Sequence, residues 1–233
     1  ITPWLRYSLA LFFTLMIVLL SSKAGLLIWI FVISVFSLLL FFIEKRRREG
    51  ILLLTVSSIV FTILLISFPH AAGRVSQAGL GSGTNPGDSL RPAAQSTGER
   101  LTVWKAAGTV ALRHLPVGTG TGDVKDALLA EYRIHHFDQV LEKRLNAHNQ
   151  YLQTTAALGV PGLAILLASI LFPLIASLRR KSPVLFLFVG SWALSLLFES
   201  MLETQAGVTF YALFNAVLLS ACDPDPSGNP LQV

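Results

Sequence analysis

A histidine and an arginine in the second half of the chain have side chains suited to a group-transfer reaction. His148 stands between two asparagines immediately before a long apolar run, and an imidazole accepts a proton near neutral pH. Arg100 opens an amphipathic stretch, and a guanidinium binds phosphate through charge-assisted hydrogen bonds. Spacing alone also fits simpler roles, in which His148 caps a helix or contacts lipid headgroups and Arg100 is a solvated charge. The elements around these residues must therefore decide between the alternatives.

The composition predicts an all-α, polytopic membrane protein. Of the 233 residues, 53% are hydrophobic and 13% are charged, whereas a soluble domain carries about 25% charged residues. This composition excludes a disordered protein, a basic nucleic-acid-binding domain and a disulfide scaffold. The single cysteine, Cys222, has no partner for an internal disulfide. Because the chain starts at Ile1 with no signal peptide, we expect a fragment of a longer protein.

The apolar runs predict about six transmembrane helices, each near the length that crosses a bilayer. They are expected at residues 4–20, 24–43, 51–68, 151–178, 184–198 and 206–221. Pro173 predicts a kink inside the fourth run. The short basic loops at residues 45–48 and 179–181 are expected in the cytoplasm. Segment 69–150 then lies on the opposite side of the membrane as a large loop.

The predicted organisation follows from these spans. Residues 1–68 and 151–222 each hold three transmembrane helices, residues 69–150 form the extracytoplasmic loop, and residues 223–233 form a cytoplasmic tail. Within the loop, the Gly-, Ser- and Pro-rich part at 69–98 is expected to be flexible, and the part at 99–150 helical. One helix is expected from about Glu99 until Leu115 and Pro116 end it, and a second from Asp123 to about Leu145. Asp123 would cap the second helix, with Asp126 three residues on.

The glycine-rich run at residues 117–122 matches no nucleotide motif. It lacks the Gly-Lys-Ser/Thr of a P-loop, and a helix rather than a strand is expected before it. We expect a tight turn whose amides, including those of Gly118 and Gly120, could help to bind an anion. His135 and His136 are adjacent, and no HExxH or Cys/His spacing occurs. No metal site is therefore expected.

Five motifs in this order resemble the O-antigen ligase and polymerase family of bacterial envelope glycosyltransferases. They are SKAG at residues 22–25, ERLTVWK at 99–105, LPVGTGTG at 115–122, AHNQYL at 147–152 and LGVPG at 158–162. The resemblance extends over nearly the whole chain. At one position the sequence departs from the family, which often has Arg where this chain has Lys23. Lysine keeps the charge but loses the planar fork that binds phosphate in a bidentate manner.

The resemblance implies an enzyme of the bacterial inner membrane with its large loop on the periplasmic side. Such an enzyme takes a glycan from an undecaprenyl pyrophosphate carrier and transfers it to an acceptor hydroxyl, without a cofactor or metal. The implied partners are this donor, a lipid A core or glycan acceptor, and membrane lipids, but no nucleic acid. Attack opposite the leaving group would invert the anomeric centre.

The resemblance also assigns roles to residues. His148 would be the general base, and Arg100 would bind the pyrophosphate. Weaker substrate-binding candidates are Lys23, Arg113, Gly118, Gly120, Asn149 and Glu199. Of these, Asn149 and Glu199 would orient His148 or contact sugar.

Three alternative functions remain open at this point. A polymerase of the same family would use a second carrier-linked glycan as acceptor. A coupled transporter is disfavoured because the expected spans carry almost no ionisable residues at mid-membrane. A non-catalytic scaffold would not explain why Arg100, the glycine turn and His148 occur together.

Overall fold

The computed structural model describes residues 23–43, 45–67 and 91–222, and its regular elements in these residues are all helices. The all-α prediction is therefore confirmed for the described part of the chain. The chain divides into two compact units, residues 1–97 and residues 98–233.

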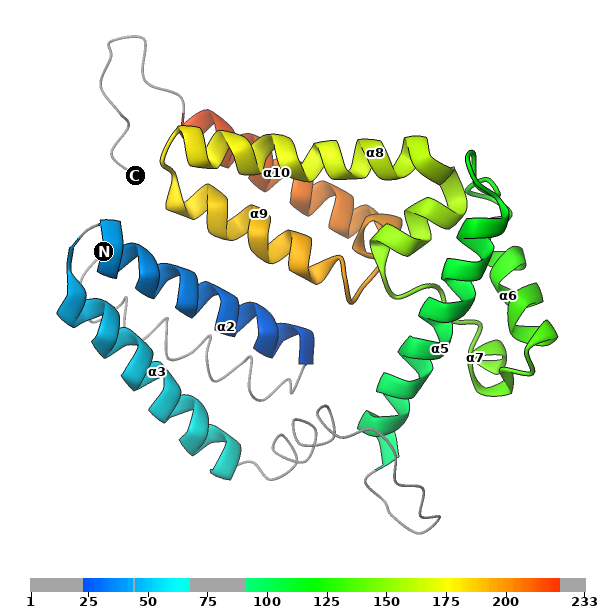
Figure 1. Cartoon of the computed structure of the whole chain (residues 1–233), viewed down its shortest axis with the longest axis horizontal. Coiled ribbons are helices and arrows are strands. Elements are labelled where there is room, and N and C mark those ends of the chain that lie inside the picture. Colours follow the sequence, from blue (N-terminus) through cyan, green and yellow to red (C-terminus); the bar gives the residue numbers. More distant parts are fainter. Residues whose placement is uncertain (1–22, 44, 68–90, 223–233) are drawn as a thin grey trace. The chain divides into compact units, whose positions relative to one another are not determined.

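The described part of the first unit is a helical hairpin. Helix α2 (Lys23–Leu38) continues into the short π-helix η1 (Leu39–Ile43), and helix α3 (Arg47–Ser67) runs back along it (Figure 1). The Ser37 hydroxyl donates to the Gly50 carbonyl at 2.7 Å, so the two helices approach closely at the turn. Near the open end, Trp29 stacks on Phe61 with ring centroids 5.2 Å apart.

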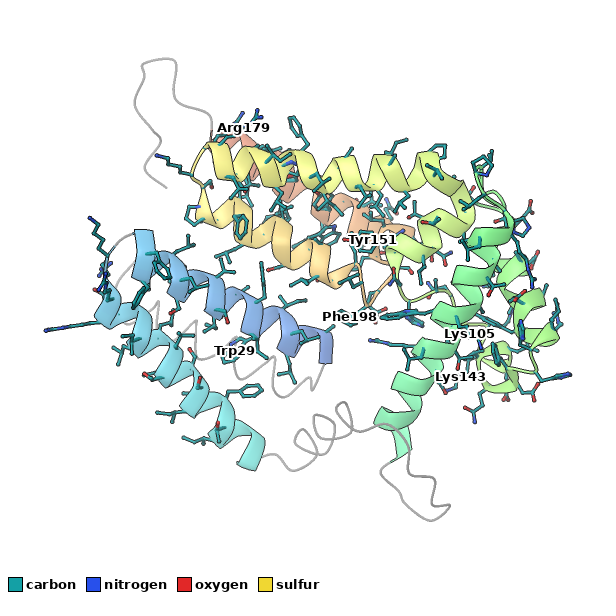
Figure 2. The ribbon with its side chains drawn as sticks, viewed as in Figure 1. Trp29, Lys105, Lys143, Tyr151, Arg179 and Phe198 are labelled. Atoms are coloured by element: carbon teal, nitrogen blue, oxygen red, sulfur yellow. The ribbon has the colours of Figure 1, made fainter. Side chains whose placement is uncertain are left out.

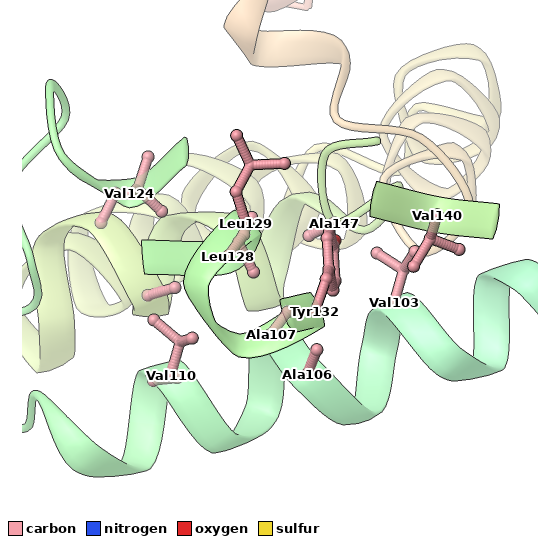
Figure 3. Packing of buried hydrophobic residues seen from close by; sticks show 13 residues of the cluster. Val103, Ala106, Ala107, Val110, Val124, Leu128, Leu129, Tyr132, Val140 and Ala147 are labelled. Atoms are coloured by element: carbon pink, nitrogen blue, oxygen red, sulfur yellow. The ribbon is translucent and has the colours of Figure 1, made fainter. Parts of the chain in front are cut away.

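Three helices correspond to the predicted loop, and the first of them runs from the end of the first unit into the second. They are α5 (Arg91–Arg113), α6 (Val124–Ile134) and α7 (Asp138–Glu142). Val103, Ala107 and Val110 recur at helical spacing on α5 and are almost fully buried. They pack against Leu128 and Tyr132 of α6, which gives the loop a hydrophobic core of its own (Figure 3). Helix α5 already begins at Arg91, before the expected start near residue 99.

The prediction of one continuous helix from Asp123 to Leu145 is wrong. Helix α6 ends at Ile134, where His136 takes a left-handed φ of 53° and the Phe137 amide donates to the Tyr132 carbonyl at 2.9 Å. This 6→1 bond is the Schellman arrangement that ends helices. Phe137 packs against the loop core, which supplies the apolar contact that accompanies such an end. At the other end, Asp123 precedes α6 but makes no side-chain cap hydrogen bond.

Three apolar helices complete the second unit. Helices α8 (Gln150–Arg179), α9 (Pro183–Ser195) and α10 (Gln205–Ala221) lie side by side, with the short 3-10 helix η2 (Met201–Glu203) before α10 (Figure 1). Their shared core consists of Leu166, Ile170, Leu185, Val189, Trp192, Leu196 and Tyr211. The chain therefore reverses twice, so that the start of α8, the end of α9 and the start of α10 meet at one end.

A break inside α8 lies at Gly159, and Pro173, where a kink was predicted, lies further along the same helix. Gly159 has φ 63° and ψ −151°, and the first turns of the helix bend away from the rest (Figure 1). The glycine turn fits into this bend. The Val160 amide donates to the Pro116 carbonyl at 2.8 Å, and the Thr119 amide donates to the Ala156 carbonyl at 2.9 Å.

Two helices in the described residues are long and apolar enough to cross a membrane. They are Ala24–Phe42 and Gln150–Arg179. Helices α9 and α10 are apolar but shorter. The predicted span at residues 4–20 lies outside the described residues.

Candidate functional site

Three charged or titratable side chains meet where the loop helices join the apolar helices. Arg100 of α5 donates through Nη2 to Glu199 Oε1 at 2.8 Å. His148, just before α8, places Nδ1 3.1 Å from Glu199 Oε2. One carboxylate in the segment after α9 thus binds both predicted catalytic residues, and its side chain remains 46% exposed. Substrate can therefore approach this Arg100–Glu199–His148 cluster from solvent.

The electrostatics of the cluster keep Glu199 ionised. The hydrogen bond with His148 holds the pKa of the Glu199 carboxyl below its ordinary value. Partial burial acts in the opposite direction, and the positive charges of His148 and Arg100 lower this pKa further. An ionised carboxylate only accepts hydrogen bonds, so the proton of this bond must sit on His148 Nδ1. In the neutral ring, Nε2 is then the nitrogen that can accept a proton.

A tryptophan one turn from Arg100 also contacts His148. Trp104 Nε1 donates to the His148 carbonyl at 3.4 Å. The ring of Trp104 lies 6.5 Å from the ring of Phe198, the residue before Glu199. Figure 2 shows Phe198 beside α5. Arg100 and Trp104 therefore act together to fix α5 against the two segments that carry His148 and Glu199.

The backbone at His148 is held in a left-handed conformation by its neighbours. His148 has φ 43°, and its amide donates to Asn146 Oδ1 at 3.1 Å. Asn146 in turn donates to Glu203 Oε2 at 2.9 Å. Asn149, rather than His148, caps α8, because its Oδ1 accepts from the Leu152 amide at 3.1 Å. Asn149 thus positions the histidine through the backbone and is itself buried.

Two buried glutamines support the site and were not identified from the sequence. The Gln150 amide donates to the Leu196 carbonyl, and Gln150 Oε1 accepts from the Leu202 amide, both at 2.8 Å. Gln153 Oε1 accepts from the Ala147 amide at 3.1 Å. These bonds join the start of α8 to the segments on both sides of it. Their signal in the sequence is a pair of polar side chains at the first turn of an apolar span.

The glycine turn does not offer its predicted anion-binding amides. The Gly118 amide donates to the His114 carbonyl and the Gly120 amide donates to the Ala157 carbonyl, both at 2.8 Å. Gly118 has φ 83°, and a Cβ there would lie 2.5 Å from the Ala157 carbonyl oxygen. Glycine is required at this position for close packing against α8. The turn is a docking element for the helix.

Of the two further predicted cations, Arg113 lies outside the cluster. Arg113, at the other end of α5, donates through Nη1 to Glu131 Oε2 at 2.6 Å. Lys23 is the first residue of α2 and belongs to the first unit, so its role stays a prediction. Among the described residues, no group of three or more His, Cys, Asp or Glu side chains could hold a metal ion.

The arrangement provides a fixed cation and a proton acceptor on either side of one carboxylate. A guanidinium carries several N–H donors, so Arg100 can bind Glu199 and still donate to a phosphate oxygen. The carboxylate fixes the histidine ring and leaves Nε2 directed away from it. These are the two groups needed to deprotonate an attacking hydroxyl and to stabilise an anionic leaving group.

The comparisons with known proteins identify a family for the chain. The chain matches the family model described as O-antigen ligase over residues 8–167, more than half of its length. The matched range contains Arg100 and His148 and ends before Glu199. No curated protein and no solved structure matches the chain. The chain therefore belongs to the O-antigen ligase family of membrane-associated glycosyltransferases, which act on a lipid-linked glycan and an acceptor.

Proposed function

We propose that the protein transfers a glycan from undecaprenyl pyrophosphate to an acceptor hydroxyl, in the manner of an O-antigen ligase, with inversion and without a metal. The observation that carries this proposal is the binding of Arg100 and His148 to the single carboxylate of Glu199. A transfer from a pyrophosphate needs a cation and a base close together. The cluster supplies both at a solvent-exposed position.

In the proposed reaction, the acceptor oxygen attacks the anomeric carbon while its proton passes to His148 Nε2. The bond between the anomeric carbon and the pyrophosphate oxygen breaks, and the electron pair leaves with that oxygen. Arg100 stabilises the negative charge on the departing pyrophosphate. Glu199 holds the histidine ring in place, and its negative charge stabilises the positive charge that the ring gains. Because attack comes from the face opposite the leaving group, the configuration at the anomeric carbon inverts.

We infer a membrane arrangement from the same part of the chain. The cluster lies where α8 begins and α9 ends, whereas Arg179, Arg180 and Lys181 lie at the other end of these helices. Short basic loops stay in the cytoplasm, which favours a site on the periplasmic face of the bacterial inner membrane. The proposal keeps six transmembrane helices, with residues 69–150 as the extracytoplasmic loop.

The experiment that tests the proposal is a transfer assay with the full-length protein in proteoliposomes. The donor is a glycan on undecaprenyl pyrophosphate, supplied with or without a lipid A core acceptor. Products are resolved by gel and mass spectrometry, and their anomeric configuration is determined by NMR. A product on the lipid core that is lost in His148→Ala supports a ligase with the proposed base.

The other outcomes of this assay are equally informative. Longer carrier-linked chains without the core would identify the polymerase of the same family. Retained anomeric configuration would contradict the direct attack. Activity that is lost in chelator and restored by a divalent ion would contradict the metal-free reaction. If neither acceptor yields product, the proposed donor and acceptor are wrong.

A further inference from the structure

We propose that a cleft between α6 and α7 binds an anionic group of the acceptor glycan. This proposal rests on the proposed transferase function and adds an acceptor subsite to it. The cleft has a volume of about 300 Å³ and is lined by Leu129, Arg133, Leu141, Glu142 and Arg144.

The lining has the composition expected for a charged sugar. Arg133 and Arg144 are exposed, and neither side chain forms an ion pair or hydrogen bond with another described residue. Two such guanidinium groups can bind a phosphate or carboxylate through charge-assisted hydrogen bonds. The partly buried Leu141 offers an apolar surface to the C–H face of a sugar ring, whereas Leu129 is buried in the loop core. The exposed Glu142 carboxylate can accept hydrogen bonds from hydroxyl groups.

A hydrogen bond joins the two walls of the cleft. Arg144 lies two residues after the end of α7 with a left-handed φ of 48°, and the following amide of Leu145 donates back to the Val140 carbonyl of α7 at 3.2 Å. On α6, the residue before Arg133 is the buried Tyr132, whose hydroxyl donates to the Leu145 carbonyl at 3.1 Å. The backbones that carry the two arginines are therefore fixed to each other.

The cleft residue Arg144 is also close in the sequence to the proposed base, His148. The four residues from Arg144 to His148 span at most about 14 Å. Lys143, next to Arg144, forms an ion pair with Glu99 at 2.6 Å, and Glu99 precedes Arg100 on α5. An acceptor whose anionic group sits in the cleft can thus extend its reacting hydroxyl towards His148. Since Arg100 is assigned to the donor pyrophosphate, the cleft is best matched to the acceptor.

The test compares acceptor kinetics of the full-length protein and an Arg133→Gln/Arg144→Gln variant in vesicles of phosphatidylcholine. The acceptors are phosphorylated lipid A core and the same core after enzymatic dephosphorylation. We expect the variant to raise KM for the phosphorylated core about 10- to 100-fold, the effect of losing charged hydrogen bonds. The kcat at saturating acceptor, the KM for the donor and the rate with dephosphorylated core should stay unchanged. Lys125→Gln, an exposed lysine elsewhere on α6, is the matched control and should leave all constants unchanged.

A binding measurement separates this proposal from the transferase proposal. Binding of phosphorylated core is measured without donor, so it reports on the cleft even if no transfer occurs. Weaker binding by the double variant but not by Lys125→Gln supports the acceptor subsite. Equal binding by wild type and double variant, or no binding by wild type, overturns it. An affinity difference that appears only in vesicles containing phosphatidylglycerol would instead assign the cleft to lipid headgroups, and would also overturn it.

Discussion

Two clusters in the second unit contain the same three kinds of side chain in different surroundings. Each pairs one arginine of α5 with one glutamate that also binds one histidine. They consist of Arg100, Glu199 and His148, and of Arg113, Glu131 and His135. The two clusters differ in burial and in chain connectivity, and we expect these differences to separate the proposed chemical site from a structural one.

Accessibility is the first difference. The Glu199 side chain is 46% exposed, whereas the Glu131 side chain is 2% exposed. A substrate can approach the first carboxylate and its partners, but only the partners of the second carboxylate reach solvent. Connectivity is the second difference. His135 lies one turn from Glu131, so that contact is local, whereas His148 and Glu199 are 51 residues apart in the sequence.

The ring nitrogens differ as well. Glu131 is bound by Nε2 of His135 and Glu199 by Nδ1 of His148. In the Glu199 cluster, the free nitrogen is therefore the one at the far end of the ring, directed away from the carboxylate. This geometry fits a base whose proton comes from a substrate. We expect substitutions in the two clusters to have different consequences.

The largest expected difference is between the histidines. His148→Ala should lower kcat for glycan transfer about 10²- to 10⁴-fold, the usual contribution of a positioned acid or base. His135→Ala should leave kcat near the wild-type value. The measurement is initial transfer rate in proteoliposomes at matched protein levels. Equal losses in the two variants would show that the clusters do not differ in function.

Substitution of the two arginines should also affect the two clusters differently, with a smaller effect on transfer kinetics than substitution of the histidines. Arg100→Gln should raise the KM for the pyrophosphate donor or lower kcat about 10- to 100-fold, because charged hydrogen bonds to phosphate are lost. Arg113→Gln removes a half-exposed partner of Glu131 and should leave donor kinetics unchanged. Arg100→Lys, which retains charge but not the planar fork, should fall between wild type and Arg100→Gln. A donor KM that responds equally to Arg113→Gln would contradict the assignment.

The free energy of unfolding should depend more on the Glu131 cluster than on the Glu199 cluster, the opposite of the pattern expected for transfer activity. Glu131→Ala removes a buried carboxylate with two partners and should lower the free energy of unfolding by about 1–3 kcal/mol. The half-exposed Glu199 should contribute less, so Glu199→Ala is expected to lower stability by less than about 1 kcal/mol. Thermal unfolding of the detergent-solubilised protein measures both. If Glu199→Ala is the more destabilising change, the site cluster also has the main structural role.

Local sequence patterns predicted helices that carry or position the residues of the two clusters. The helical spacing of Val103, Ala107 and Val110 places the apolar face of α5, and the apolar runs place α8, α9 and α10. Such periodicity depends on neighbouring residues only. The order of the motifs also identified the family correctly.

The partners within the clusters could not be predicted in this way. Arg100 and Glu199 are 99 residues apart, and their contact depends on how α5 packs against the segment after α9. Arg113 could be predicted as a cation from the sequence, but its buried partner Glu131 could not. The break at His136 was missed because a left-handed conformation is uncommon for a residue other than glycine. The apolar Phe137 just after it was the available signal.

The smallest expected effect concerns the pH dependence of the site cluster. The pKa of Glu199 is lower in the folded protein than its ordinary value. Its contribution to stability is therefore fully present above the ordinary carboxyl pKa of about 4.3 and is lost as pH falls through the lowered folded value. The difference in unfolding temperature between wild type and Glu199→Gln should thus stay constant from about pH 8 to pH 6 and shrink only under acidic conditions. A difference that fades between pH 8 and pH 6 would mean that Glu199 is partly protonated there. A protonated carboxyl can donate its O–H to Nδ1 of His148 instead of accepting the Nδ1 proton, which would place the ring proton on Nε2. The two clusters would then no longer differ as argued, because Nε2 of His148 would carry a proton and could not act as the base.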